Sequence, residues 1–471
     1  MSPTVDLGAP ASPEVLRAAG FDGSAIAEWL VAQPAASAGL DLDRERFAEF
    51  WGRCDDLLRR LPPKPRRNEA ETAAAAVLLA AGRGQRERFL RAHAATVYER
   101  LTGNRSHFVR VEHLVYEAAA SFPGLVPTRE RLALERDCLQ RDKDGLEIDQ
   151  GIFLAHVLAH EPAGLHLCHA MLLPLPESRS LLDKLARDGR IDLGPALVER
   201  RGQATHVTTR NPRHLNAEDN STLEATEIAV DLAILDPATQ IAVLRGGPID
   251  NPKYAGRRVF GAGINLTHLY RGQIPFVWFL ARDMGFVHKF LRGVARPDAL
   301  PDDVRGQAVE KPWIAAVDAF AIGGHCQILL TMDYVLAAHD AYLTLPARKE
   351  GIIPGLANLR MPRFTGDRIA RQAVQYERKI MCDSPEGLLL CDEIAPADEM
   401  DAALARIVDG LTSAGVVSAV ANRRAFRIGE EPLDLFRRYC SAYARDQAYC
   451  HFSPALIANL ERNWNAHNRK T

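Results

Sequence analysis

The stretch Phe320-Ala321-Ile322-Gly323-Gly324-His325-Cys326-Gln327 decides the fold. It ends an apolar segment over 311–324, KPWIAAVDAFAIGG, which is typical of a buried β-strand. The double glycine allows a tight turn, and HCQILLTMDYVLAA over 325–338 predicts a helix that leads into another strand. A strand, a glycine turn, a helix and a second strand predict one βαβ unit of a layered α/β domain.

Two other segments also contain glycine turns. Gly261-Ala262-Gly263-Ile264-Asn265 predicts a loop that enters a helix, and LPARKEGIIPG over 345–355 carries a further glycine turn. Glycine lets the backbone approach a ligand closely, and the N–H groups at a helix start have no intrahelical partner. Two such N–H groups that meet at one carbonyl oxygen form an oxyanion hole. Taken alone, each glycine pair is more often just a tight turn.

The elements around these segments outline the rest of the chain. ALVERRGQATHVTTR over 196–210 predicts a β-hairpin, LEATEIAVDLAIL over 223–235 a helix, and QIAVLRGG over 240–247 a strand. Before the hairpin, residues 70–101 predict a long helix, and residues 151–174 predict another that Pro162 and Gly164 interrupt. An earlier helix should bury one apolar face, made by Phe47, Phe50, Trp51, Leu57 and Leu58.

From about residue 365 the chain reads as helical again. We therefore expect an N-terminal helical domain over 1–195, an α/β core over 196–365 and a C-terminal helical region over 366–471.

Composition narrows the class of protein. The chain has 471 residues, 47% of them hydrophobic and 25% charged, with a net charge of −2, which indicates no nucleic-acid or membrane partner. Its eight cysteines form no CxxC pair, which is typical of reduced thiols. Neither a signal peptide nor an uninterrupted apolar run of about 18 residues is visible, so we expect a cytoplasmic protein.

The order of the segments resembles the enoyl-CoA hydratase/isomerase, or crotonase, superfamily over about residues 196 to 420. NPRHLNA over 211–217, VFGAGINLTHL over 259–269, the double-glycine stretch and GIIPG over 351–355 follow the family's order. The resemblance implies an α/β crotonase (ClpP/crotonase-like) core, a ββα superhelix, and an acyl-CoA substrate. It also implies that the N–H groups of Ile264 and Gly324 bind the thioester oxygen. Relatives form trimers or trimer pairs, so a homo-oligomer is expected.

The same resemblance places the CoA. Arg213, Leu215 and Ala262 would lie along it, although Arg213 is equally consistent with a solvated surface arginine.

The positions at which this chain departs from the family are as informative about its activity as those that match. Hydratases carry two glutamates at positions that are Gln327 and Ala347 here. Without two carboxylates the chain lacks the acid/base pair that adds water to an enoyl double bond. We therefore do not expect simple hydratase activity.

The helical N-terminal region and the segments over 246–263 and 267–294 resemble the cofactor-independent dioxygenases that act on (3,5-dihydroxyphenyl)acetyl-CoA. Those enzymes serve dihydroxyphenylglycine biosynthesis for vancomycin-type glycopeptide antibiotics. The resemblance implies a reaction of the arylacetyl-CoA with O2 that gives 3,5-dihydroxyphenylglyoxylate and CoA, with no metal and no flavin.

Ring recognition is assigned to Arg282, Gln327 and Glu218, and Ile353 with Leu345 would line the pocket. Gln327 lies one helical turn after Gly324, so its amide can face the acyl group. Alternatives stay open: a structural ion pair for Arg282, a helix cap for Glu218 and plain core for the two apolar residues. The group that takes the α-proton is not identified.

Other readings remain. His156, His160, His166, Cys168 and His169 superficially suggest metal ligands, but Pro162 breaks the helix that such a site needs, so no metal is expected. Cys326 is interpreted as a buried thiol. The alternative functions are another enolate-forming enzyme, such as an acyl-CoA isomerase or thioester hydrolase, and a non-catalytic CoA-binding relative.

Overall fold

The computed structural model describes residues 12–34, 39–302 and 304–469. The first eleven residues, where no signal peptide is expected, lie outside the described residues. The described chain forms two compact units: a helical unit of residues 12–167, 270–277 and 440–457, and a second unit of residues 168–269, 278–439 and 458–469. Each unit draws on separated segments, and the domain boundaries at 195 and 365 stay predictions.

The helical unit is built on two long helices, α3 and α4. Helix α4 begins with a capping box between Asn68 and Glu71 and fills the predicted range almost completely. Phe47 and Trp51 of α3 pack on Phe89 of α4, with ring centroids 5.3 and 5.4 Å from that of Phe89. The apolar face predicted for α3 is buried. The helices here are α1 (Pro13–Ala18), α2 (Gly23–Val31), α3 (Leu40–Arg60), α4 (Glu69–Leu101), α5 (Val111–Ser121), α6 (Arg129–Ala133), α7 (Ile148–Ala159) and the first part of α8 (Glu161–Leu172).

The break predicted inside residues 151–174 occurs one step earlier than expected. The helix ends at His160, whose backbone is extended at φ −82° and ψ 115°. Pro162 lies in the first turn of α8, where a missing N–H removes no intrahelical bond. The interruption predicted at Gly164 was wrong, because its N–H donates to His160 O at 2.8 Å and the helix continues.

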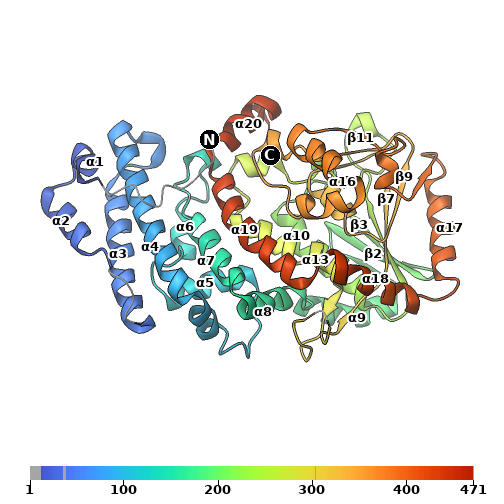
Figure 1. The fold of residues 1–471 in the computed structure, drawn as a ribbon. Helices are drawn as coiled ribbons and strands as arrows, with labels where there is room; N and C mark the ends of the chain where they lie inside the picture. Colours follow the sequence, from blue (N-terminus) through green and yellow to red (C-terminus); the bar gives the residue numbers. More distant parts are fainter. Residues whose placement is uncertain (1–11, 35–38, 303, 470–471) are drawn as a thin grey trace. The chain divides into compact units, whose positions relative to one another are not determined.

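The second unit contains a seven-stranded sheet in the order β1-β2-β3-β4-β7-β9-β12, whose strands run side by side in Figure 1. Its pairs from β3 to β12 are parallel, and β1, β2 and β3 pair antiparallel. These strands are β1 (Arg190–Asp192), β2 (Ala196–Arg201), β3 (Ala204–Thr209), β4 (Ile241–Gly246), β7 (Trp313–Val317), β9 (Tyr334–Ala338) and β12 (Glu393–Ala395). The predicted hairpin is β2 and β3, and the α/β class is confirmed.

The single strand predicted over 311–324 was wrong, because this segment forms two strands in two different sheets. The chain forms β7, leaves the main sheet at Asp318, and continues as β8 (Phe320–Ile322) in a three-stranded sheet, order β11-β10-β8. Its other strands are β10 (Tyr342–Thr344) and β11 (Ile380–Met381), and a two-stranded sheet pairs β5 (Val294–Ala295) with β6 (Ala308–Val309). The purely helical character predicted beyond 365 was therefore wrong at β11 and β12.

Helices cover the main sheet and complete the unit. Helix α10 packs on β2 and β3, and α17 packs on β9. The helices are α9 (Pro176–Asp188), α10 (Asn220–Leu235), α11 (Leu266–Tyr270), α12 (Phe276–Met284), α13 (Phe286–Arg292), α14 (Gly324–Leu329), α15 (Ala347–Glu350), α16 (Ala357–Tyr376), α17 (Met400–Thr412), α18 (Val417–Glu430), α19 (Leu433–His451) and α20 (Pro454–Trp464). Helices α8, α12, α19 and α20 contain residues of both units.

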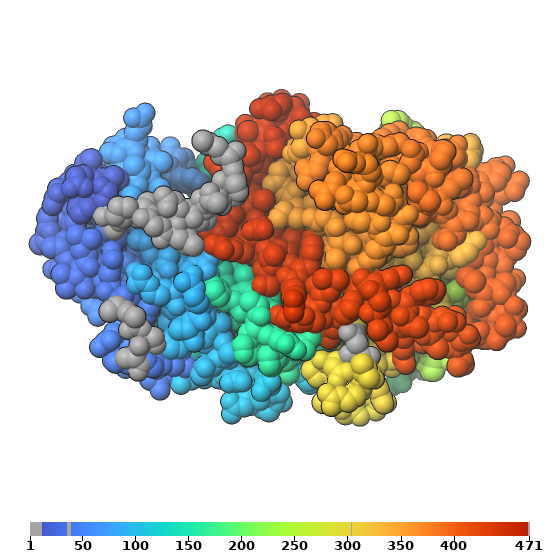
Figure 2. All heavy atoms as spheres, in the orientation of Figure 1, coloured from blue at the N-terminus to red at the C-terminus, as the bar shows by residue number. Residues whose placement is uncertain are grey.

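Helix α18 lies on the surface of the face drawn in Figure 2, and Val417, Phe426 and Ile428 on it are exposed. Over the described residues no single helix is long and apolar enough to cross a membrane; α17 and α18 together pass that test but meet at a bend of 92°.

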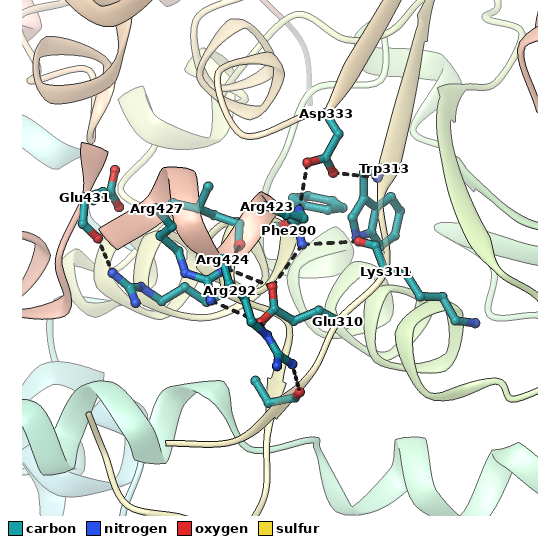
Figure 3. A network of polar contacts seen from close by, with 12 residues as sticks. Phe290, Arg292, Glu310, Lys311, Trp313, Asp333, Arg423, Arg424, Arg427 and Glu431 are labelled. Atoms are coloured by element: carbon teal, nitrogen blue, oxygen red, sulfur yellow. Dashed lines mark hydrogen bonds and ion pairs between the residues drawn. The ribbon is translucent and has the colours of Figure 1, made fainter. Parts of the chain in front are cut away.

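Three arginines fix α18 to the α/β core (Figure 3). Glu310 accepts hydrogen bonds from Arg424 Nε at 2.7 Å and from Arg427 Nη1 at 2.8 Å. Arg423 Nε donates to Asp333 Oδ1 at 2.8 Å, and Asp333 Oδ2 accepts from Trp313 N at 2.8 Å. Both oxygens of each carboxylate are thus paired.

Candidate active site

The two glycine loops lie against each other. Ile322 N donates to Gly261 O at 3.0 Å, and Gly261 N donates to Phe320 O at 3.4 Å. A Cβ atom built on Gly263 would lie 2.9 Å from Ile322 O and 3.1 Å from Gly324 N. Gly263 and Gly323 have φ values of 77° and 55°, which side chains rarely tolerate. Only glycine permits this close approach.

The amides of Ile264 and Gly324 are available for a ligand. Glu218 N donates to Gly263 O at 2.7 Å, and Asn265 N donates to Glu218 O at 2.8 Å. The residues on both sides of Ile264 are therefore bonded to the backbone of Glu218. Gly324 is the first residue of α14, so its N–H has no intrahelical acceptor. Among the described residues neither N–H makes a hydrogen bond. The helix predicted to follow the double glycine, within residues 325–338, ends at Leu329.

His325 holds the first loop in place. Its Nδ1 accepts a hydrogen bond from the N–H of Gly263 at 3.0 Å, so Nδ1 carries no proton and the neutral ring is protonated at Nε2. Burial lowers the pKa of His325 to about 4, which keeps the ring neutral at ordinary pH. Sequence reasoning missed this role, because it depends on a partner 62 residues away.

The three residues predicted to recognise the ring meet in one buried cluster. Arg282 of α12 donates from Nε to Glu218 Oε1 at 2.9 Å and from Nη1 to Gln327 Oε1 at 3.0 Å. It also donates to Gly324 O at 2.8 Å and to Asp283 Oδ1 at 2.6 Å. The ion pair considered for Arg282 therefore exists within the same site. The cap considered for Glu218 was wrong, because Asp219 caps α10 instead.

One oxygen of this cluster is unpaired. Glu218 Oε2 is buried and makes no hydrogen bond among the described residues, and His325 Nδ1 lies 3.9 Å from it. Burial would raise the pKa of Glu218, but Arg282 and His325 outweigh it and the pKa is lowered, so the group is a carboxylate. Glu218 and His325 line a small pocket of about 20 Å³ with Phe260, Phe286 and Phe290.

A second, larger pocket has a volume of about 270 Å³. Its lining includes Ile264 and the three residues predicted to contact CoA, Arg213, Leu215 and Ala262. Asn216 fixes the turn that carries Arg213, because its Nδ2 donates to Gly247 O and Val259 O, both at 2.8 Å. The predicted CoA residues and Ile264, whose amide is a predicted oxyanion donor, thus line a single cavity.

Other candidates do not gather here. Ile353 is half-buried and lines neither of these two pockets, whereas Leu345 belongs to the hydrophobic core. Burial raises the pKa of Cys326 to about 12, as suits an inert thiol.

The histidines considered as metal ligands have separate partners. His156 Nε2 bonds Glu87 at 2.7 Å and His166 Nδ1 bonds Tyr98 at 2.7 Å. Within residues 12–34, 39–302 and 304–469 no three His, Cys, Asp or Glu side chains gather as a metal site would require.

Comparisons with known proteins identify relatives of the chain. The family model described as enoyl-CoA hydratase/isomerase matches residues 199–429. The (3,5-dihydroxyphenyl)acetyl-CoA 1,2-dioxygenase of Amycolatopsis orientalis is 45% identical over 428 residues, which are 91% of this chain and 97% of that protein. The short-chain-enoyl-CoA hydratase of Clostridium acetobutylicum is 24% identical over 240 residues, 51% of this chain and 83% of that protein.

Among solved structures, the carnitinyl-CoA hydratase of Mycobacterium avium has a TM-score of 0.48 and 22% identity, and the match covers 58% of this chain and 97% of that one. With the family model on the α/β core and a relative of 45% identity along nearly its whole length, the chain belongs to the enoyl-CoA hydratase/isomerase (crotonase) superfamily.

Proposed function

We propose that the chain is a cofactor-independent dioxygenase that converts (3,5-dihydroxyphenyl)acetyl-CoA and O2 into 3,5-dihydroxyphenylglyoxylate and CoA. One observation carries the proposal: the unpaired amides of Ile264 and Gly324, on touching loops, adjoin the buried Arg282–Glu218–Gln327 cluster. Identity of 45% to a dioxygenase with this substrate in its name supports it.

The first step is loss of an α-proton. The carbonyl and the ring both acidify the α-carbon of an arylacetyl thioester, and its removal leaves a conjugated enolate. Two N–H donors at the thioester oxygen stabilise the charge that develops there, and loss of one such donor typically costs about 100- to 1000-fold in rate. Ile264 and Gly324 supply these donors.

The enolate is the reductant for O2. It transfers one electron to O2, and the resulting radicals combine at the α-carbon to give a peroxide. The peroxide attacks the thioester carbonyl, the C–S bond breaks and CoA leaves as a thiolate. Loss of the second α-hydrogen with cleavage of the O–O bond then gives the α-keto acid. Both oxygen atoms enter the product, and the two α-hydrogens leave as protons.

Ring recognition uses the polar cluster beside the hole. Glu218 Oε2 is a buried acceptor without a hydrogen-bond partner among the described residues. Arg282 holds the other carboxylate oxygen and the Gln327 amide in fixed positions. An unpaired buried acceptor strongly favours a ligand that donates to it, because an apolar ring would leave it unsatisfied. A phenol is thereby selected over an unsubstituted phenyl group.

Hydration is not the activity. Gln327 accepts from Arg282 Nη1, and Ala347 stands at the start of α15, so neither of the family's carboxylate positions can exchange a proton.

The test compares aerobic and anaerobic incubation of the full chain with (3,5-dihydroxyphenyl)acetyl-CoA. The release of CoA and the appearance of the α-keto acid should require O2 and should persist in EDTA. CoA release of equal rate under argon would identify a thioester hydrolase, and isomerised substrate without O2 uptake an isomerase. Tight binding with no turnover would identify a non-catalytic relative.

A homo-oligomer, a trimer or a pair of trimers, is part of the proposal. Exposed apolar side chains support it: Leu388 and Leu389 are 56% and 47% exposed and Phe426 of α18 is 67% exposed. Light scattering of the purified chain should give three or six times the 51.9 kDa chain mass, and a monomer would contradict this.

A further inference from the structure

The C-terminal segment of the second unit, residues 458–469, reaches the pocket assigned above to CoA. Trp464 and Arg469 line the same pocket of about 270 Å³ as Arg213, Ala262 and Ile264. Trp464 and Arg469 follow those three residues by about 200 to 250 positions in the sequence, and no motif relates the two groups. One pocket is therefore lined by Ile264, a tryptophan and an arginine.

Contacts to α15 fix the position of this segment. Asn459 Nδ2 donates to Arg348 O at 3.3 Å, and Asn463 Nδ2 donates to Lys349 O at 3.2 Å. Carbonyls in the last turn of a helix have no intrahelical partner, so these two amides satisfy groups that the short helix leaves open. Leu460 and Ala466 are buried, which anchors the segment on both sides of Trp464.

The groups brought to the pocket suit a nucleotide. Arg469 Nε donates to Trp464 O at 3.0 Å, and its guanidinium carbon lies 5.1 Å from the Trp464 ring centroid. The pocket lining carries the guanidinium groups of Arg213 and Arg469 against one carboxylate, that of Asp250. A flat indole stacks on a purine base, and guanidinium groups bind phosphate through paired N–H donors.

We infer that Trp464 and Arg469 form a nucleotide subsite that binds the phosphorylated adenosine end of the CoA thioester. The inference rests on the proposed function only in taking a CoA thioester as substrate. These residues determine which thioester is bound and hold it; they do not touch the reacting atoms. Since Ile264 lines the same pocket, the nucleotide and the thioester ends of one molecule occupy one cavity.

The test uses the full chain and three variants. Arg469→Ala and Trp464→Leu change the subsite, and Arg462→Ala is the matched control, because Arg462 is an exposed arginine of α20 that does not line the pocket. Calorimetry gives the Kd of CoA itself, which requires no turnover. Kinetics then compare the arylacetyl thioester of CoA with that of N-acetylcysteamine, which has no nucleotide.

Arg469→Ala should weaken CoA binding about tenfold or more and raise KM for the CoA thioester by a similar factor, as expected for a lost charge-assisted hydrogen bond. Trp464→Leu should act in the same direction. Both should leave kcat, and all constants for the N-acetylcysteamine thioester, within about twofold of Arg462→Ala.

Equal CoA affinity in Arg469→Ala and Arg462→Ala would overturn the inference, as would an equal loss of activity on both thioesters. CoA binding that depends on Arg469 in a chain that consumes no O2 would sustain the subsite and remove the proposed function.

Discussion

The second unit contains two buried polar networks of similar composition and different completeness. Around Glu310 and Asp333, every carboxylate oxygen accepts a hydrogen bond, and three arginines of one surface helix are held by them (Figure 3). Around Arg282, by contrast, Glu218 Oε2 is buried and makes no hydrogen bond within the described part of the chain, and neither do the neighbouring amides of Ile264 and Gly324. A complete network holds a fold together, whereas an incomplete one, which costs stability, indicates a place for a ligand.

The largest effect is expected from breaking the complete network. Glu310→Ala leaves Arg427 buried without its carboxylate and removes one of the two carboxylates beside Arg423, and should lower the free energy of unfolding by about 3–5 kcal/mol. Urea denaturation measures it. Asp367→Ala, which breaks an exposed pair with Arg371, is the control and should change it by less than about 1 kcal/mol. Similar losses in the two variants would contradict the distinction between the networks.

A side chain added beside Arg282 and Glu218 should abolish activity. It should change the free energy of unfolding less than Glu310→Ala does. A Cβ atom at residue 324 would lie 2.8 Å from Arg282 Nη2 and closer still to Glu218 Oε2, so Gly324→Ala displaces the amide that binds the oxyanion. We expect kcat to fall at least about 100- to 1000-fold. Gly410→Ala, on α17 with nothing within 4 Å of the added atom, is the control. A well-folded Gly324→Ala variant within tenfold of normal activity would refute this role.

Glu350 extends the comparison of the two networks, because this buried carboxylate has no ion pair among the described residues. Burial, with the charge of Glu377, raises the pKa of Glu350 to about 7. Between pH 4.5 and 7 the folded chain keeps this proton while the unfolded chain releases it, so the stability contributed by Glu350 falls as pH rises through that window. Glu350→Gln should therefore gain about 1–3 kcal/mol relative to the unchanged chain between pH 4.5 and pH 8. A stability difference that does not vary with pH would show that Glu350 titrates normally.

The smallest effect is expected at His325, which positions the loop without touching the substrate. His325→Leu removes the acceptor of the Gly263 N–H and should lower kcat about tenfold with KM unchanged. His325→Asn keeps an acceptor oxygen and should recover part of the loss. If the two variants are equally impaired, the residue serves packing alone.

Sequence predicted the elements whose pattern is local. The helix over 70–101 and the hairpin over 196–210 follow from periodicity and turn chemistry, and both are present. The continuous apolar run over 311–324 concealed a change of sheet at Asp318, because buried strands of both sheets have the same composition. Strands β11 and β12, of two and three residues, are too short to show alternation.

In the candidate site, too, only residues marked by a local pattern could be predicted from the sequence alone. The loops of Ile264 and Gly324 were found because each is marked by glycines within a few residues. Gln327 was found from its spacing of one helical turn after Gly324, and Arg282 from the segment that resembles a known family. His325 and Trp464 were missed, because their roles depend on partners far away in the sequence, Gly263 for the first and the turn at Arg213 for the second. Contacts of this kind leave no local pattern.

The most direct measurement is hydrogen exchange at the α-carbon of (3,5-dihydroxyphenyl)acetyl-CoA in D2O under argon, followed by mass spectrometry. If the two backbone amides stabilise an enolate, the unchanged chain should exchange the α-hydrogens without O2 and without releasing CoA, and Gly324→Ala should lose that exchange by about 100-fold or more. Aerobic turnover of the normal rate with no exchange above the enzyme-free background would contradict an enolate held by Ile264 and Gly324.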